Sequence, residues 1–249
     1  MPATSPEGEL GTHAAVHFSA LRDLARILLG ERSLTAVLHE VARLARVTIP
    51  GVDEVSITLE SDATRISAFS GSLAVALDEW QYEAGFGPCV GAATSGVPIR
   101  SDDTACDDLY PSFAALARRQ GVTSLLAMPL PMPSRFSGAI GLYRLRRDEP
   151  VSREAEAVAA SFAVYAGVAV ANAALFAQRE QYVNRLVATM ESRSVIDQAK
   201  GVVMSAVRCD ADAAFQVLVL ESNKSNRKVR DLAVDIVSSA ERGDSLNLS

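Results

Sequence analysis

The chain has 249 residues, of which 49% are hydrophobic and 22% charged, and its formal net charge is −6. This composition is typical of a globular chain with one large or two small domains. The acidic excess lies in residues 1–175, because residues 176–249 contain ten basic and ten acidic side chains. Bulk attraction to nucleic acid is therefore excluded for the first part, and the second part could bind it only through a local basic patch.

The three cysteines, Cys89, Cys106 and Cys209, form no CxxC motif and no cluster with histidine. An odd number without framework spacing indicates a reducing compartment and argues against a disulfide scaffold or a zinc site. Residues 1–14 lack a basic segment followed by an apolar run, so we expect a disordered lead-in there and no secretory signal. Together these features predict a cytoplasmic protein without a bound metal or cofactor.

Apolar periodicity predicts an α+β domain over residues 15–175, in which helices flank one antiparallel sheet. The expected helices are Val16–Leu29, Leu34–Val47 with Ser33 as N-cap, a short helix from the Gly85–Cys89 turn to Thr94, and Tyr110–Arg119. The expected strands are Val55–Leu59, Arg65–Phe69, Leu73–Leu77, Val97–Arg100, Ser124–Leu130 and Ala139–Arg146.

A long helix is expected from Ser152 to about Ala206. Residues 157–177 carry no charge over about 20 residues, which is long enough to span a bilayer. However, this stretch is rich in alanine and has arginines on both sides, so we expect a buried helix and no membrane span. A stripe of small residues predicts close helix packing: Ala159, Ala163, Gly167 and Ala171.

The same helix carries a heptad pattern between Val158 and Met190, interrupted by Asn172 and Arg179. This seam predicts a parallel homodimer, with residues 176–190 as a coiled-coil linker that is continuous with both domains. The alternative is a helix packed on its own domain up to about residue 175, followed by a plain linker helix.

Residues 180–241 contain three short helical patterns and all three lysines of the chain, and residues 242–249 form a tail. The apolar stripe from Val229 to Ala240 predicts an amphipathic third helix, with Ser225 or Asn226 as its N-cap. Arg227 and Lys228 open this helix, although the helix dipole disfavours positive charge there by roughly 0.3–1 kcal/mol. This start indicates an anion-binding site, unless both side chains are simply solvated.

The segment SRSVIDQAKGVVM, residues 192–204, resembles the opening of ANTAR domains. The resemblance continues through Ala213–Phe215, Leu218, Ser222 and Asn226–Ala233. It implies an all-α three-helix bundle that binds paired stem-loops in a nascent leader transcript as a dimer, which keeps a terminator hairpin from forming. This chain departs from the family after Met204 and after Leu218, where Ser205-Ala206 and Val219-Leu220 replace polar residues that members often carry.

Phe215 is the one aromatic residue between Ser192 and Glu241, and it lies in the apolar stripe, so we expect it in the core. RNA recognition would then depend on hydrogen bonds and phosphate contacts. Three candidates have structural alternatives: Asn226 as an N-cap, Ser222 as a core residue, and Arg193 in an i,i+4 pair with Asp197. The candidate RNA-binding residues are Arg193, Lys200, Gly201, Ser222, Asn223, Lys224, Asn226, Arg227, Lys228 and Arg230.

Residues 15–175 resemble a GAF domain of the actinobacterial sensor type. The matching segments are Asp78–Cys89, Gly96–Ile99, Gly121–Ser124, Pro129-Leu130 and Gly138–Tyr143. The resemblance implies a pocket for an unidentified small-molecule signal, since a fold alone does not name its ligand. The candidate pocket residues are Trp80, Tyr82, Cys89, Tyr110, Phe113 and Met128.

These resemblances predict a signal-responsive antitermination regulator that is not an enzyme. One alternative is a thiol redox enzyme or sensor that uses Cys89 and Cys106, because a cysteine at a helix start has a lowered pKa. Equally, Cys89 could simply pack in the pocket wall. The acidic loop around Cys106 could hold a cation or be solvated. A DNA-binding regulator is disfavoured by the neutral second part and its acidic side chains.

Overall fold

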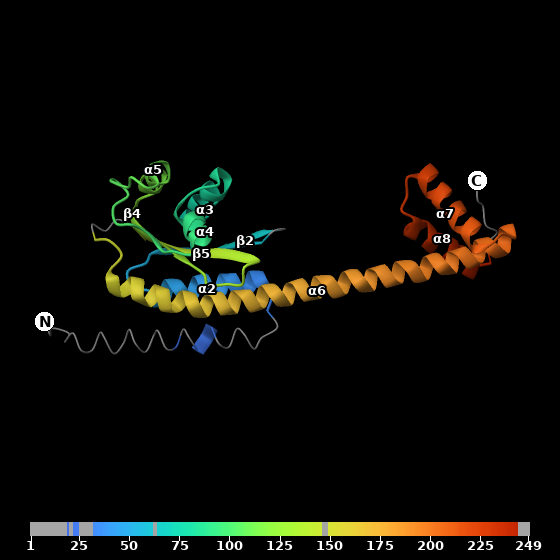
Figure 1. Ribbon diagram of the computed structural model, residues 1–249, viewed down its shortest axis with the longest axis horizontal. Helices are drawn as coiled ribbons and strands as arrows, with labels where there is room; N and C mark the ends of the chain where they lie inside the picture. The colour runs from blue at the N-terminus through green and yellow to red at the C-terminus, as the bar shows by residue number, and fades with distance from the viewer. Residues whose placement is uncertain (1–18, 20–21, 25–31, 62–63, 146–148, 244–249) are drawn as a thin grey trace. The chain divides into compact units, whose positions relative to one another are not determined.

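A computed structural model of the chain describes residues 19, 22–24, 32–61, 64–145 and 149–243 (Figure 1). The chain divides into two compact units, Met1–Ala177 and Gln178–Ser249. Ser19 and residues 22–24 are helical, but most of the predicted helix Val16–Leu29 lies outside the described residues. The predicted lead-in 1–14, with His13, and most of the tail 242–249 also lie outside them.

The first unit is built on a five-stranded antiparallel sheet with the order β2-β1-β5-β4-β3. The register places Ile57 of β1 opposite Ala68 of β2 and Ile140 of β5. The sheet confirms the predicted α+β architecture. Its strands are β1 (Glu54–Ser61), β2 (Arg65–Phe69), β3 (Ile99–Ser101), β4 (Val122–Pro129) and β5 (Phe136–Leu145).

The predicted strand Leu73–Leu77 is wrong, because these residues belong to helix α3 (Ser72–Ala84). The buried residues of α3 are Ala74, Leu77, Asp78 and Gln81, which follow the helical spacing i, i+3, i+4, i+7. Glu54 of β1 accepts a hydrogen bond from the backbone N–H of Ala74 at 2.9 Å and so satisfies one free donor at the start of α3. Because Asp78 is a polar residue at one of these buried positions, the apolar residues alone did not reveal the helical period.

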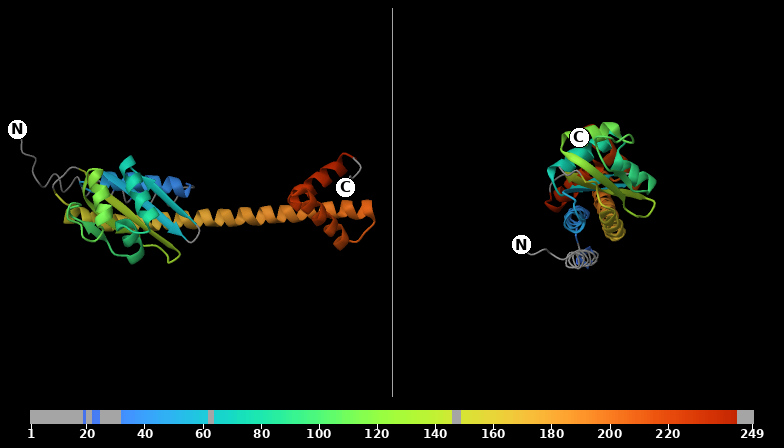
Figure 2. Two further views of the ribbon diagram at one scale, coloured as in Figure 1. Left: turned by 90° about the horizontal axis from the view of Figure 1, so that it is seen from above. Right: turned by 90° about the vertical axis from the view of Figure 1, so that its left-hand side faces the viewer.

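Two layers of helices cover the two faces of the sheet (Figure 1). Helices α3, α4 (Pro88–Ser95) and α5 (Pro111–Arg119) lie on one face. Helix α2 (Leu34–Thr48) and the first part of α6 (Arg153–Val207) lie side by side on the other, as both views of Figure 2 show. Ser33 caps α2 as predicted, since its hydroxyl accepts a hydrogen bond from the N–H of Ala36 at 3.3 Å.

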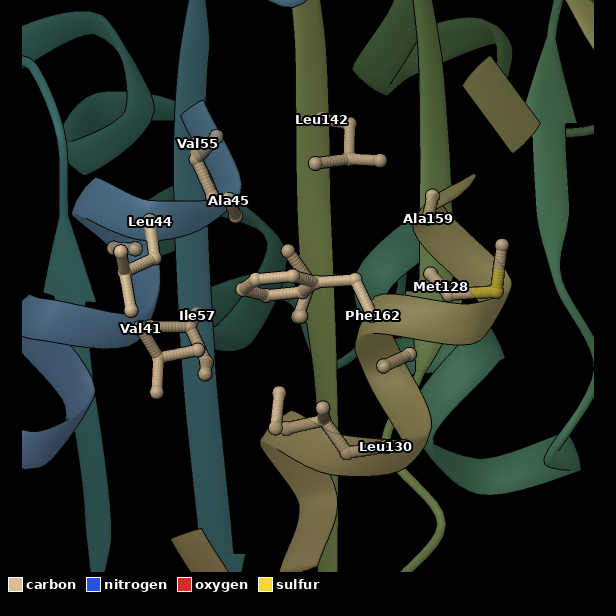
Figure 3. Close-up of a cluster of buried hydrophobic side chains, with 14 of the residues drawn as sticks. Val41, Leu44, Ala45, Val55, Ile57, Met128, Leu130, Leu142, Ala159 and Phe162 are labelled. Carbon is tan, nitrogen blue, oxygen red and sulfur yellow. The ribbon is translucent and has the colours of Figure 1, made fainter. Parts of the chain in front are cut away.

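The larger hydrophobic core lies between the sheet and the α2–α6 layer. Phe162 of α6 is fully buried there, and its ring points toward Val41 of α2 and Ile57 of β1 (Figure 3). Strand side chains alternate between the faces. Val55 and Ile57 therefore belong to this core, whereas Ser56 and Thr58 point toward α3.

Helix α6 packs tightly through its small residues. A Cβ atom on Gly167 would lie 2.6 Å from the carbonyl oxygen of Pro131, which is closer than real Cβ contacts come. Ala159, Ala163 and Ala171 are buried along the same stripe. The predicted close approach of this helix is confirmed, and its partners are the sheet and the proline-rich loop after β4.

Helix α6 is long and apolar enough to cross a membrane by length and composition, with a mean hydropathy of 1.8 over its most apolar window. Half of that window is buried inside the protein. A core helix that packs against its own sheet passes the same test, so the helix gives only weak support for a membrane span.

The second unit contains the end of α6, helix α7 (Ala211–Ser225) and helix α8 (Val229–Glu241). Asp210 caps α7, because its carboxylate accepts a hydrogen bond from the N–H of Ala213 at 2.8 Å. The three helices share one core, as predicted for a three-helix bundle. Its buried residues are Ala199, Val203, Ala214, Leu218, Leu232, Ala233 and Ile236.

The predicted N-cap of the third helix is wrong. Asn226 ends α7 in the left-handed conformation, with φ of 52°, and Lys228 is the N-cap residue of α8. Ser225 remains in α7, where its hydroxyl donates to the carbonyl oxygen of Glu221 at 2.7 Å. Asparagine tolerates positive φ better than most residues, so it can serve as a C-cap as well as an N-cap.

Candidate functional site

Between helix α3 and the sheet of the first unit, a buried carboxylate is surrounded by hydroxyl groups. Asp78 of α3 is 1% exposed. Its two oxygens accept hydrogen bonds from Ser56 at 3.0 Å and from Thr58 at 2.5 Å, both on β1. Burial raises the pKa of the Asp78 carboxyl above its ordinary value, and the bonds from Thr58 and Ser56 oppose this rise.

The polar cluster extends from Asp78 to helix α4. The hydroxyl of Tyr143 lies 3.4 Å from that of Ser56, 3.5 Å from the amide nitrogen of Gln81 and 3.7 Å from the Cys89 sulfur. Gln81 also accepts a hydrogen bond from the backbone N–H of Cys89 at 2.8 Å. These contacts form one connected network between α3, α4, β1 and β5.

A cavity of about 160 Å³ opens beside this cluster, between β2 and α3. Its lining carries two carboxylates, one guanidinium, two hydroxyls and one phenyl ring. The lining residues are Arg65, Ser67, Phe69, Asp78, Glu79 and Tyr82.

The predicted pocket residues do not gather around one space. Tyr82 is the one that lines the cavity between β2 and α3. Trp80, Tyr110 and Phe113 pack together in the core beneath α3 and α5. Met128 lies on the opposite face of the sheet, in the core with α2 and α6 (Figure 3). Because neighbouring strand residues face opposite ways, Met128 points away from the face that carries Asp78.

The prediction of a lowered thiol pKa at Cys89 is wrong. The side chain is buried in a small cluster with Ala92, Ala127 and Ala139. Burial raises the pKa of the Cys89 thiol to about 12, and the nearby Asp78 adds to this rise. The effect of the helix start is therefore outweighed by loss of solvent. Cys106, by contrast, is exposed.

The acidic loop uses its carboxylates to shape the backbone. Asp103 accepts a hydrogen bond from the N–H of Ala105 at 2.8 Å. Asp107 accepts from the N–H groups of Leu109 and Tyr110 at 2.9 and 2.8 Å, just before α5 begins. Among the described residues, no group of three or more His, Cys, Asp or Glu side chains could hold a metal ion.

Two arginines of the sheet bind the start of α6. Arg100 of β3 donates to the carbonyl oxygen of Val151 at 2.5 Å and pairs with Glu156 at 2.9 Å. Arg144 of β5 donates to the carbonyl oxygen of Pro150 at 2.5 Å. Ile99, next to Arg100, packs with Cys89 of α4. The start of α6 is thus tied to the same strands that contact the polar cluster.

In the second unit, four of the candidate RNA-binding cations form ion pairs on the surface. Lys200 pairs with Asp197 at 3.7 Å, which replaces the predicted pair of Asp197 with Arg193. The other pairs are Arg230 with Glu191 at 3.7 Å, Arg227 with Asp235 at 2.6 Å, and Lys224 with Glu221 at 3.9 Å. Arg193 and Lys228 are exposed and form no ion pair within the described part of the chain.

The uncharged candidates differ in their positions. Ser222 is buried, and its hydroxyl donates to the carbonyl oxygen of Arg227, which is a structural role. Asn223 and Asn226 are exposed. Gly201 faces open space, with nothing within 4 Å of the position a Cβ would take. Phe215 was expected in the core but is 38% exposed, because Ala214 and Leu218 occupy the buried positions of α7.

Sequence patterns of two domain families match the chain. The GAF domain family matches residues 33–170, which is more than half of the chain. The ANTAR domain family matches residues 184–237. No curated protein matches the chain.

Several solved structures resemble part of the chain. A LuxR family transcription factor from Burkholderia cenocepacia, CepR2, is 13% identical, with a TM-score of 0.49 over 62% of this chain and 93% of that one. The GAF domain of a phosphoenolpyruvate-protein phosphotransferase from Coxiella burnetii is 18% identical, with a TM-score of 0.49 over 66% and 98%. The reduced form of fRMsr from Staphylococcus aureus is 13% identical, with a TM-score of 0.46 over 62% and 95%.

These structural scores lie below 0.5, so the family assignment comes from the sequence patterns alone. A GAF domain followed by an ANTAR domain is an architecture of signal-responsive regulators with RNA-binding capacity. The chain belongs to the GAF domain family and carries an ANTAR domain behind its GAF domain.

Proposed function

We propose that the protein binds paired stem-loops in nascent leader transcripts and promotes transcription antitermination in response to a small-molecule signal. The observation that carries this proposal is the ANTAR match over residues 184–237, which coincides with a three-helix core that packs separately from the sheet domain. By occupying stem-loops that overlap a terminator hairpin, the protein would let transcription continue. We expect this activity in the cytoplasm.

The charges on the second unit support an RNA-binding surface. Arg193 and Lys228 are available for phosphate contacts, since they form no ion pair within the described residues. The pairs of Lys200 and Arg230 are both long, at 3.7 Å, and their acidic partners Asp197 and Glu191 are exposed, and such surface pairs contribute only about 0–1 kcal/mol. RNA phosphates can therefore replace their acidic partners at little cost.

A homodimer is supported by the apolar residues that α6 leaves exposed. Val183, Leu186 and Met190 lie on the predicted seam and are all exposed within the single chain. In contrast, seam positions Phe162 and Ala169 are buried in their own domain. This agrees with the alternative interpretation, in which the helix packs on its own domain up to about residue 175. We therefore propose that the dimer contact lies mainly in residues 176–190, with exposed Phe176 at its beginning.

The signal would reach α6 through its first residues. Arg100 links strand β3 to Val151 and Glu156, and the same strand packs on α4 beside the polar cluster. A ligand that shifts α3 or α4 would change this contact and hence the position of α6 on the sheet of its own domain. Replacing Arg100 with Gln should weaken the response to the signal and leave basal RNA binding unchanged.

A thiol enzyme that uses Cys89 and Cys106 is less well supported. The Cys89 thiol is buried, with a pKa raised to about 12, so little reactive thiolate is present near neutral pH. A DNA-binding role is disfavoured because residues 176–249 carry no net positive charge.

The test is binding of the full-length protein to leader RNAs at defined salt, compared with an Arg193→Ala/Lys200→Ala/Lys228→Ala/Arg230→Ala variant. We expect selective binding of paired stem-loops, loss of that binding in the variant, and a smaller salt dependence. A Glu83→Gln variant is the matched control, because it changes an exposed charge on α3 of the GAF unit. Equal binding by the wild type and the quadruple variant would contradict the proposed surface.

A further inference from the structure

The Asp78 carboxylate has no positive partner of its own. Among the described residues, no Lys, Arg or His nitrogen forms an ion pair with it, and its two oxygens are held by the hydroxyls of Ser56 and Thr58. Burying an ionised carboxylate is expensive unless a cation compensates it. Arg65 on the cavity wall acts on Asp78 through its charge but forms no ion pair with it, so a cation in direct contact with the carboxylate would stabilise its ionised form.

The direction of the hydrogen bonds shows what the cavity offers to a ligand. Thr58 has one hydroxyl proton, which it donates to Asp78. The Ser67 hydroxyl lies 2.7 Å from that of Thr58 and also forms a hydrogen bond with Asp78, so its one proton is used within this cluster and its lone pairs remain as acceptors for a ligand in the cavity. The cavity wall formed by Asp78 and Ser67 is accordingly an acceptor surface.

Two other lining residues extend this surface. The hydroxyl of Tyr82 is buried without a hydrogen-bond partner among the described residues. Glu79 adds a second carboxylate to the lining. Arg65 is the only cation of the lining, and its guanidinium lies 4.7 Å above the Tyr82 ring without an ion pair to Asp78. The lining thus carries one more negative than positive charge.

We propose that this cavity binds a small molecule through a primary ammonium group, which pairs with Asp78 and donates to Ser67. The proposal rests on the role of the GAF unit as the signal-binding part of the proposed regulator. The cavity volume of about 160 Å³ is close to that of cavities that hold one benzene-sized molecule. The ligand would have the size of an amino acid or a short diamine.

The ammonium group could come from two kinds of molecule. A zwitterionic amino acid would place its carboxylate near Arg65, whereas a diamine would place its second ammonium near Glu79. A metal ion fits less well, because the described residues offer no group of three ligating side chains.

Ligand binding would be transmitted through the network behind Asp78. Ser56 connects this carboxylate to Tyr143, whose hydroxyl lies 3.7 Å from the Cys89 sulfur on α4. Neutralising Asp78 would change the strength of each of these hydrogen bonds. This gives a physical route from the cavity to the helix that packs on β3.

The test is calorimetric titration of the full-length protein with 1,4-diaminobutane, 1,3-diaminopropane, glycine, L-alanine and L-serine. The same compounds acetylated on every amino nitrogen lack the ammonium group and serve as matched controls. We expect at least one amine to bind and its acetylated form not to bind. Asp78→Asn should weaken that binding by at least roughly tenfold. Glu83→Gln, on the same helix but outside the lining, should leave it unchanged.

Further variants separate the two kinds of ligand and protect the test from misfolding. Arg65→Gln should weaken only amino acids, and Glu79→Gln should weaken only diamines. If Asp78→Asn does not fold, Ser67→Ala provides the test, since it removes one acceptor of the ammonium group. Absence of binding by every amine, or equal binding of the acetylated forms, would overturn the proposal. RNA binding is measured on the same samples, so an intact RNA complex without amine binding contradicts this proposal alone.

Discussion

The GAF unit buries the charged side chain of Asp78 between α3 and its sheet, whereas the ANTAR unit keeps its charged side chains at the surface. Asp78 is 1% exposed and is satisfied by hydroxyl groups alone among the described residues. Arg227 and Asp235 of the ANTAR unit pair in contact with solvent. A buried carboxylate without an ion-pair partner is costly to ionise, and a cationic ligand would offset that cost. Exposed, weakly paired charges are suited to a polyanion that displaces them.

The largest expected effect concerns the cysteines, two of which lie in the GAF unit and one in the ANTAR unit. Cys89 should react with iodoacetamide at least roughly 100 times more slowly than exposed Cys106, because it is buried and its pKa is raised to about 12. Half-buried Cys209 of the ANTAR unit should react at an intermediate rate. A mass-spectrometric time course at pH 7.5 checks this. Equally fast labelling of Cys89 would favour the thiol redox alternative.

The same substitution in the two units should have opposite effects on stability. Gly141→Ala should lower the free energy of unfolding of the GAF unit by about 1–3 kcal/mol, since its Cβ would lie 2.6 Å from the Ser56 hydroxyl and 2.8 Å from the Cys89 sulfur. Gly201→Ala should stabilise the ANTAR unit by about 0.5–1 kcal/mol, because that helical position faces open space.

Urea denaturation distinguishes these effects, because the fluorescence of Trp80, the one tryptophan of the chain, reports on the GAF unit. Circular dichroism reports on both units. A stabilising Gly141→Ala substitution would show that the polar cluster is loosely packed, which would contradict the arrangement around Asp78.

Asp78 should give the GAF unit a characteristic dependence on pH. Its pKa is raised in the folded state, so the folded protein binds this proton more tightly than the unfolded chain does. Stability should therefore fall as the pH rises from the unfolded value of about 3.9 through the raised folded value. Asp78→Asn should remove a slope of at most about 1.4 kcal/mol per pH unit in that window. Identical pH profiles for the two proteins would show that Asp78 is not desolvated.

The smallest effect is expected for the surface pair of the ANTAR unit. Asp235→Asn removes the partner of Arg227 and should change the free energy of unfolding by less than about 1 kcal/mol. The same change should strengthen RNA binding slightly, because Arg227 no longer has a competing carboxylate. Thermal unfolding and RNA titration measure the two quantities. A large loss of stability would mean that this pair supports the fold.

Patterned elements could be predicted from the sequence, and residues that break the pattern could not. The strands and most of the described helices agree with the apolar periods, and Ser33 caps α2 as its position indicated. Residues 73–77 were mistaken for a strand because Asp78 and Gln81 are polar members of a buried helical stripe. At the turn that contains Asn226 and Lys228, the Ser222 hydroxyl donates a hydrogen bond to the carbonyl oxygen of Arg227, a contact that the apolar period does not reveal.

The cavity between β2 and α3 could not be predicted from the sequence. The aromatic residues chosen for the pocket, such as Trp80 and Phe113, fill the core instead. The cavity is lined by Arg65 and Ser67, which alternate along β2 and read as ordinary polar positions of an edge strand. The one sequence signal was Asp78 itself, an acidic residue that follows Ala74 and Leu77 on the same helix face.

The central claim is tested most directly by transcription in vitro from a leader template that contains a paired stem-loop and a terminator. We predict that the full-length protein raises read-through and that the Arg193→Ala/Lys200→Ala/Lys228→Ala/Arg230→Ala variant does not. A folded wild-type protein that leaves termination unchanged, with and without an amine that binds it, would contradict the account. So would equal read-through with the variant.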